Sequence, residues 1–108
     1  MTQNIDAVLT QRGNQYGSFE GHAHITQDIK HAMKSGVSWQ SLTDSQKEAL
    51  EMVAHKIGRI CNGNPNYKDS WTDIIGYTRL VEKDLPEPAA GNVAGNVVTV
   101  SMILPETK

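Results

Sequence analysis

Apolar residues recur every three or four positions in three segments of the chain, the spacing at which side chains share one face of a helix. Each repeat predicts an amphipathic helix whose apolar stripe faces a common core. The stripes are Ile25, Ile29, Ala32 and Met33 in the first segment, Leu50, Val53, Ile57 and Ile60 in the second, and Trp71, Ile74, Thr78, Val81 and Leu85 in the third. A shorter helix through residues 5–9 is expected before them.

Capping residues predict where these helices begin, because a Ser, Thr, Asp or Asn side chain can accept a hydrogen bond from the first free N–H groups. Thr43 with Gln46 predicts a capping box in front of the longest helix, which is expected to run to about Cys61. The other predicted caps are Thr2 or Asn4 for the first helix, Ser18 for the second, and Asp69 or Ser70 for the last.

Glycine and turn residues predict where the helices end. Gly13 and Gly36 are expected to stop the first two helices, and residues 38–42 to form a single turn. Trp39 in this turn has no periodic partners, which leaves its role open between packing and ligand contact. Residues 62–66, Asn-Gly-Asn-Pro-Asn, predict a tight turn. Together these signals predict an all-α bundle of three to four helices.

After Leu85 the sequence changes character. Residues 86–91 contain two prolines and a glycine and predict a linker, whereas the β-branched segment 97–104 predicts an extended strand. We therefore divide the chain into a helical domain, 1–85, and a linker with an extended C-terminal tail, 86–108. Since no second strand is expected in the chain, pairing with the same segment of another copy would produce a homo-oligomer, with a closed dimer as the first expectation. The alternative is a disordered tail.

Composition narrows the class of protein. The 108 residues suit one domain, and a formal net charge of −2 argues against binding nucleic acid or an anionic membrane by bulk charge. No apolar run reaches the roughly 20 residues of a membrane span, and residues 1–12 lack a signal-peptide core. The single Cys61 excludes an internal disulfide and is expected in the core. We expect a cytoplasmic protein whose four histidines are packed or on the surface rather than metal ligands.

Two pairs of carboxylates are candidates for a metal site. Glu48 and Glu51 fall about 60° apart on the longest predicted helix, and Asp69 and Asp73 lie one turn apart on the next. The short turn between these helices makes them antiparallel, which could bring the four carboxylates together as hard oxygen ligands for Mg²⁺. The alternative is that they are solvated side chains favoured near helix N-termini.

Basic and aromatic residues suggest phosphate binding. Lys56 and Arg59 follow the glutamates on the same helix, where they could bind an anion or could be a Lys with a buried stem and a solvent-exposed Arg. Arg12 and Tyr16 lie beside two glycines at a helix start, whose free N–H groups can hold an anion. Tyr16 could stack on a base or simply cover the end of the bundle. Tyr77 shares the flank of the aspartates and is a further candidate ligand contact.

Three segments carry a resemblance to a known family: residues 48–65, which read Glu-Ala-Leu-Glu-Met-Val-Ala-His-Lys-Ile-Gly-Arg-Ile-Cys-Asn-Gly-Asn-Pro, residues 69–80, and Arg12-Gly13 with residues 16–19. Over about residues 5–85 the chain resembles small phage and prophage proteins of undefined function, which implies the host cytoplasm as its location. More distantly, it is similar to the MazG-type all-α nucleoside triphosphate pyrophosphohydrolases. Those enzymes hold Mg²⁺ between a Glu-x-x-Glu pair and a Glu-x-x-Asp pair on successive helices.

The MazG-type resemblance implies a role for each matching residue. Glu48 and Glu51 match the first pair and would be catalytic and metal ligands. Asp69 and Asp73 stand where the second pair would be, but with a spacing of four instead of three and with Asp in place of Glu. Lys56 and Arg59 would then serve the phosphates. Members of the MazG-type family usually form oligomers, which implies a homo-oligomer here as well.

Two functions of different classes follow. The first is a Mg²⁺-dependent enzyme that hydrolyses a nucleoside triphosphate to the monophosphate and pyrophosphate. The alternative is a protein without catalysis that binds a nucleotide or a cyclic nucleotide used in host defence and sequesters it. A purely structural interaction protein is the third possibility.

Overall fold

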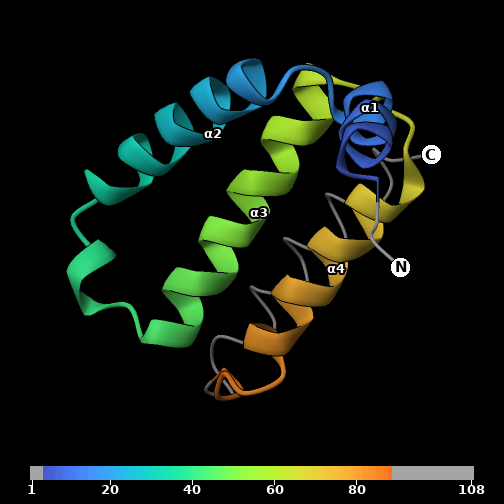
Figure 1. Cartoon of the computed structure of the whole chain (residues 1–108). Coiled ribbons are helices and arrows are strands. Elements are labelled where there is room, and N and C mark those ends of the chain that lie inside the picture. Colours follow the sequence, from blue (N-terminus) through green and yellow to red (C-terminus); the bar gives the residue numbers. More distant parts are fainter. Residues whose placement is uncertain (1–3, 89–108) are drawn as a thin grey trace.

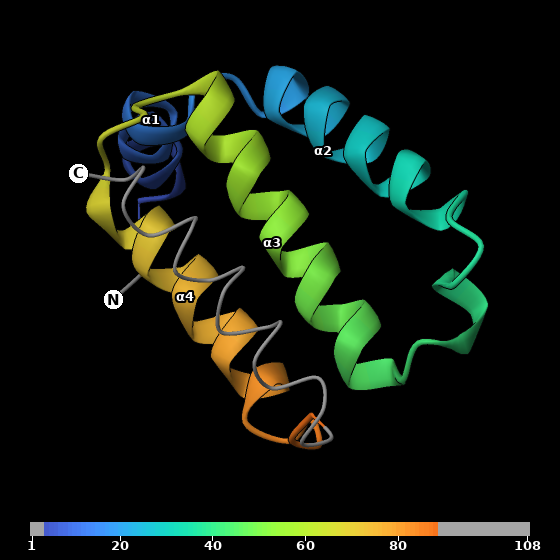
Figure 2. The same ribbon diagram turned by 180° about the vertical axis from the view of Figure 1, so that it is seen from behind.

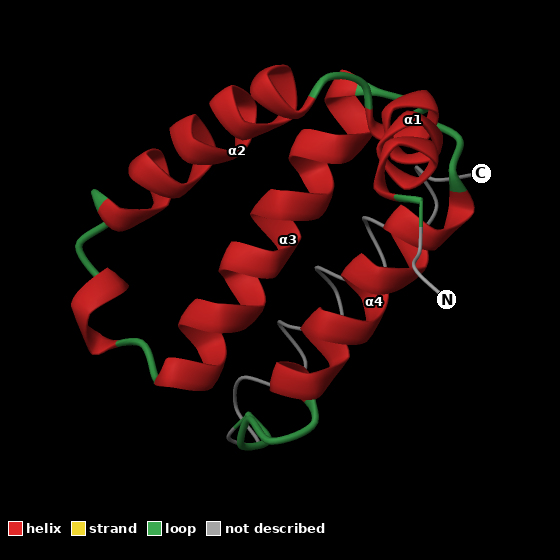
Figure 3. Cartoon of the chain, viewed as in Figure 1, coloured by secondary structure: helices red, strands yellow, loops and turns green. Residues whose placement is uncertain are grey.

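The protein is built from helices only in the part described by the computed structural model, residues 4–88. In chain order the elements are α1 (Ile5–Tyr16), α2 (Phe19–Lys34), the 3₁₀ turn η1 (Trp39–Ser41), α3 (Asp44–Asn62) and α4 (Lys68–Glu82) (Figures 1 and 3). None of the helices within residues 4–88 combines the length and the hydrophobicity that a membrane span requires. The all-α prediction is confirmed, whereas the predicted strand at 97–104 lies outside the described residues.

The helices form an open layer with α3 in its centre. Both ribbon views show α2 along one side of α3 and α4 along the other, with α1 crossing near the end of α3 (Figures 1 and 2). The contacts agree, because α3 packs extensively on both α2 and α4, while among the described residues α2 and α4 share almost none. One helix therefore holds the other three in place.

Most of the predicted caps are present. Asn4 accepts a hydrogen bond from the Ala7 N–H at 3.1 Å, and Ser18 accepts one from Gly21 at 3.0 Å. Thr43 and Gln46 form the predicted reciprocal capping box. The predicted cap of α4 is wrong: α4 begins at Lys68 with Tyr67 at its N-cap, and Ser70 is instead buried against α3.

One of the two predicted helix ends needs correction. Helix α1 continues through Gly13 to Tyr16 and stops at Gly17, the residue that has a positive φ of 75°. A glycine in a helix interior lowers the stability of the helix by only about 1 kcal/mol relative to alanine, so Gly13 alone does not end α1. Helix α2 ends at Lys34, with Ser35 at its C-cap and Gly36 directly after the cap, where the sequence predicts the stop. The single turn at 38–42 is confirmed as η1, and its Trp39 is buried.

Small and polar residues, rather than the apolar stripes, fill the seams between the helices. Thr26 and Ala54 are buried where α2 meets α3, and Ala49, Lys56 and Ser70 where α3 meets α4. The predicted burial of Leu50 and Trp71 is wrong, since they are 40% and 51% exposed. Close helix approach requires small side chains at the seam, so the large ones point out of the layer. Cys61 is likewise exposed instead of in the core.

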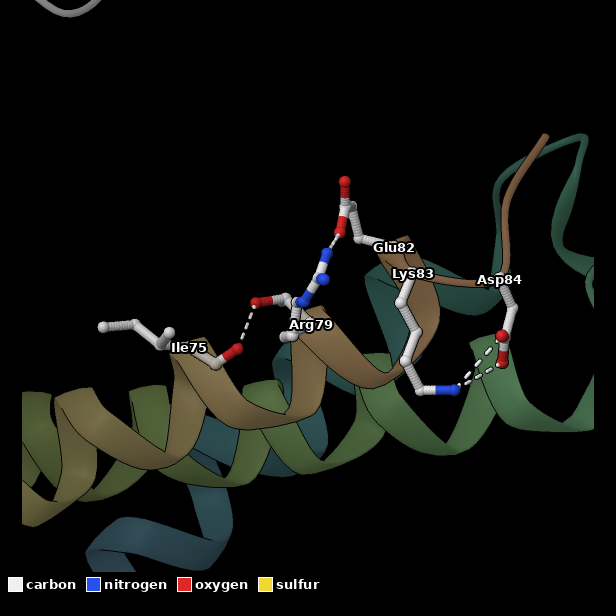
Figure 4. Close-up of polar contacts among 6 residues, drawn as sticks. Ile75, Arg79, Glu82, Lys83 and Asp84 are labelled. Atoms are coloured by element: carbon white, nitrogen blue, oxygen red, sulfur yellow. Dashed lines mark hydrogen bonds and ion pairs between the residues drawn. The ribbon is translucent and has the colours of Figure 1, made fainter. Parts of the chain in front are cut away.

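One ion pair lies in the last turn of α4 and a second lies just after the helix ends. Arg79 pairs with Glu82, and Lys83 pairs with Asp84 at 3.0 Å (Figure 4). These pairs are exposed, and such contacts contribute little to stability.

Candidate functional site

A cavity of about 530 Å³ lies where α1, the start of α2 and the end of α3 meet. We call it the α1–α2 cavity. Its walls are mainly apolar, and the polar groups that reach it come from three different helices: Arg12 and Tyr16 from α1, Ser18 and His22 from the start of α2, and Arg59 from α3. A concave, mostly apolar site with a few convergent polar groups is typical of a small-molecule site.

Asn62 at the end of α3 holds the turn between α1 and α2. Its side-chain amide donates to the carbonyl oxygens of Tyr16 and Ser18, both at 2.8 Å. The turn passes so close that a Cβ on Gly17 would lie 2.7 Å from the Asn62 amide nitrogen, and the positive φ of Gly17 also favours glycine. A second link is the Asn64 N–H, which donates to the Gln15 carbonyl at 2.7 Å. These contacts hold the backbone of residues 16–18, which line the cavity, in place.

Arg59 reaches from α3 onto the ring of Tyr16, with its guanidinium carbon 3.9 Å from the ring centroid. The other edge of Tyr16 meets Tyr67, at 5.9 Å between centroids. Within residues 4–88, no carboxylate lies within ion-pair distance of Arg59 or Arg12. The buried Nε of Arg59 also has no hydrogen-bond partner there. Two positive charges therefore face the cavity without a counter-charge from the described part of the chain.

His22 forms the inner wall of the cavity and is 4% exposed. Its Nε2 lies 3.2 Å from the His55 carbonyl, which can only accept, so Nε2 carries the proton and Nδ1 is an acceptor. Burial lowers the pKa of His22, and nearby Arg59 and Lys30 lower it further. Burial also lowers the pKa of His55 to about 4, helped by Arg59. Both imidazoles are therefore neutral at pH 7.

The four predicted metal-binding carboxylates point to different partners. Asp73 pairs with the buried Lys56 at 2.7 Å, and Glu51 pairs with Lys30 of α2 at 3.7 Å. The negative charge of Asp69, close to the hydroxyl of Tyr67, raises the pKa of that phenol. Glu48 instead lines a separate hollow between α3 and α4, together with Tyr77.

The predicted clustering of these carboxylates is not seen within residues 4–88. No three His, Cys, Asp or Glu side chains of this region come together as a metal-binding group. The reason is angular: Glu51 is turned toward α2, while Asp73 faces Lys56 on the other side of α3. As they lie in one chain, the carboxylates do not fit a Mg²⁺ site, and their catalytic role stays a prediction. Lys56 and Arg59 are also separated, because Lys56 is held by α4 and Arg59 by α1.

Sequence reasoning missed Asn62, Asn64 and His22 as parts of the site. The two asparagines carried only a turn signal, since their partners lie 44 to 49 positions earlier in the chain. Arg12, Tyr16 and Arg59 were predicted as ligand-binding residues together with Lys56 and Tyr77. The fold brings the first three to one cavity, whereas Lys56 and Tyr77 do not line it.

Comparison with known protein families matches residues 1–84 to the domain of unknown function DUF6378. The chain therefore belongs to this family. No curated protein and no solved structure matches it significantly. The family description names no activity, so the phage origin and the similarity to MazG-type enzymes stay predictions.

Proposed function

We propose that the protein binds a nucleotide, or a nucleotide-derived ligand with phosphate groups, in the α1–α2 cavity. The observation that carries this proposal is the pair of guanidinium groups, Arg12 and Arg59, which line one cavity without a carboxylate partner among the described residues. Arg presents a planar fork of donors that matches phosphate oxygens. The start of α2 lies beside them and adds the positive end of a helix dipole.

The remaining walls suit the base and sugar of a nucleotide. Phe19 is 78% exposed at the rim of the cavity, so its ring is free to stack on a base. Neutral His22 offers its Nδ1 as an acceptor for an amino or hydroxyl group. Apolar walls with a few fixed polar groups give both affinity and orientation.

Binding is better supported than hydrolysis by the contacts of a single chain. The pyrophosphohydrolase suggested by sequence needs several carboxylates around Mg²⁺, and two of the four candidates are already neutralised by Lys30 and Lys56. The cavity lies at the far end of α3 from Glu48, which lines a different hollow. We therefore propose binding without turnover. Hydrolysis is the alternative, and the experiment below can detect it.

Calorimetry on the full chain tests this proposal. The titrants are ATP, the four deoxynucleoside triphosphates, and cyclic di- and trinucleotides, each without divalent metal. Arg12→Gln and Arg59→Gln should each weaken binding at least tenfold, because a hydrogen bond to a charged group contributes about 1.5–3 kcal/mol. Arg79→Gln is the matched control, since Arg79 lies on α4 outside the cavity.

Three results would contradict the proposal. They are the absence of binding for every member of the panel, equal weakening by Arg79→Gln, or unchanged affinity of both cavity variants. A parallel incubation with Mg²⁺ measures pyrophosphate. Its release, abolished by Glu48→Gln, would favour the enzyme over the binding protein.

A further inference from the structure

Large apolar side chains gather on one face of the helical layer. A groove of about 260 Å³ between α3 and α4 is lined by Leu50, Thr78 and Leu85, and it opens on this face. At 100° per residue, Trp71 and Ile75 fall on the same side of α4 as Thr78, whereas Leu80 falls on the opposite side. We call this surface the apolar face; its members are Leu50, Val53 and Ile57 of α3 and Trp71, Ile74 and Ile75 of α4.

The apolar face is poorly covered by the described chain. Ile75 is 68% exposed and Trp71 51%, and the other members are at least partly exposed. Among residues 4–88 only three hydrophobic residues are buried, Trp39, Ala49 and Ala54, and no large side chain is fully buried. Domains are normally built from at least two packed layers around one core. The described helices supply a single layer.

We propose that a second copy of the chain covers the apolar face with its own apolar face, making a two-fold dimer of two helical layers. The six side chains that define the face are uncharged, and Glu82, the one acidic residue lining the groove, is paired with Arg79, so two identical faces can meet without strong like-charge repulsion. The charged residues beside Ile75 are already satisfied, since Arg79 pairs with Glu82 on the same helix (Figure 4). Charge therefore favours a second copy of this face over a charged partner.

The size of the apolar face also suits a dimer. Helix α3 has 19 residues, which at 1.5 Å per residue gives a length of roughly 28 Å. Each helix is about 10–12 Å across with its side chains, so α3 and α4 together present a face roughly 20 Å wide. Two such faces would bury on the order of 1,200 Å² of accessible surface, which is the range of stable protein–protein interfaces.

The chain's own residues 97–104 are a poorer cover. If they lay on this face as the extended strand that their sequence predicts, their backbone donors and acceptors would meet helix side chains and stay unpaired. The helices of a second copy satisfy their backbone internally and bring only side chains to the interface. We therefore assign the interface to the helices and not to the tail.

Light scattering after size exclusion tests the assignment on the full chain. The mass measured for the wild type should be twice the chain mass of 11.9 kDa. Ile75→Glu places a charge in the interface and should raise the dimer dissociation constant at least a hundredfold. Leu80→Glu is the matched control on the opposite side of α4, where the side chain is similarly exposed at 58%, and should leave the dimer intact.

A photo-cross-linking amino acid at each position gives a readout that does not depend on disrupting the fold. Incorporated at position 75 it should trap covalent dimers on irradiation, and at position 80 it should not. A monomeric wild type, or equal effects at both positions, would overturn the proposal. A monomer in which position 75 cross-links to residues 97–104 would overturn it in favour of the tail. Nucleotide binding is not part of this test, because the α1–α2 cavity is lined by Arg59, about 200° around α3 from Ile57.

Discussion

Gly58 is the point at which α3 can least accept a larger residue, so Gly58→Ala is a direct test of the seam with α2. The glycine is buried in this seam. A methyl group there would collide with the Thr26 hydroxyl and would lie 2.9 Å from His22 Cδ2 and 3.2 Å from the His22 carbonyl oxygen. None of these three groups can easily move, because the residues that carry them, His22 and Thr26, are each only 4% exposed.

The expected magnitude is the balance of two effects. Alanine is favoured over glycine in a helix interior by about 1 kcal/mol. Overpacking a filled site typically costs 1–3 kcal/mol, and the contact with a backbone carbonyl places this site at the upper end of that range. Gly58→Ala should therefore lower the free energy of unfolding by about 1–2 kcal/mol. The matched control is Gly76→Ala on α4, where nothing lies within 4 Å of the new methyl group, so it should gain about 0.5–1 kcal/mol.

Thermal and urea unfolding, followed by circular dichroism at one fixed protein concentration, measure both variants. For a domain of this size 1 kcal/mol corresponds to roughly 4–8 °C in Tm, so the two variants should melt on opposite sides of the wild type. A Gly58→Ala protein as stable as Gly76→Ala would refute the reasoning. It would mean that α2 does not lie against α3 at this position.

Two further predictions concern charges in the seams. Burial lowers the pKa of His22 and lowers that of His55 to about 4; since the unfolded chain binds these protons near pH 6.5, stability should fall as the pH drops from about 7 toward 4. Urea midpoints at pH 7.5 and 5 measure this loss, which should shrink in His55→Gln; equal midpoints in the wild type would contradict it. Asp73→Asn leaves the buried Lys56 cation without its partner and should cost about 1–3 kcal/mol, more than Lys56→Met, which leaves only the 45% exposed Asp73 carboxylate unpaired. Equal losses of unfolding free energy in the two variants, measured by urea denaturation, would show that the burial of Lys56 does not determine the cost of breaking this ion pair.

Local signals in the sequence predicted the helix starts because their physics is local. Ser18 bonds the N–H three residues later, and Thr43 and Gln46 bond each other's backbone within one turn. The start of α4 was mispredicted for the opposite reason. Tyr67, the N-cap of α4, makes no side-chain cap hydrogen bond and packs instead against Tyr16, 51 positions earlier, a contact that no local signal reveals.

The candidate site was only partly predictable for the same reason. Arg12, Tyr16 and Arg59 carry chemistry that can be seen in the sequence, but their meeting depends on Asn62 holding the α1–α2 turn across 44 and 46 positions. The carboxylates show the converse. Their spacing fitted a metal site, yet two of them pair with Lys30 and Lys56 on neighbouring helices, and no periodicity reveals a cross-helix partner.

The apolar stripes show what helical periodicity does and does not determine. A repeat of Leu50, Val53 and Ile57 fixes that these side chains share one direction around α3, but the direction could be toward a neighbouring helix of the same chain or away from all of them. A different property determines which side of α3 packs against α2. This property is the small size of Ala54 and Gly58, because only small side chains let helix axes approach closely. Both patterns coexist on α3 about 60–100° apart, so the helix packs sideways through its small residues and leaves its apolar stripe facing out of the layer. If a second copy covers this outward stripe, as we propose, the stability of the fold depends on dimer formation. The oligomeric state of the full chain is therefore the measurement that tests this reasoning.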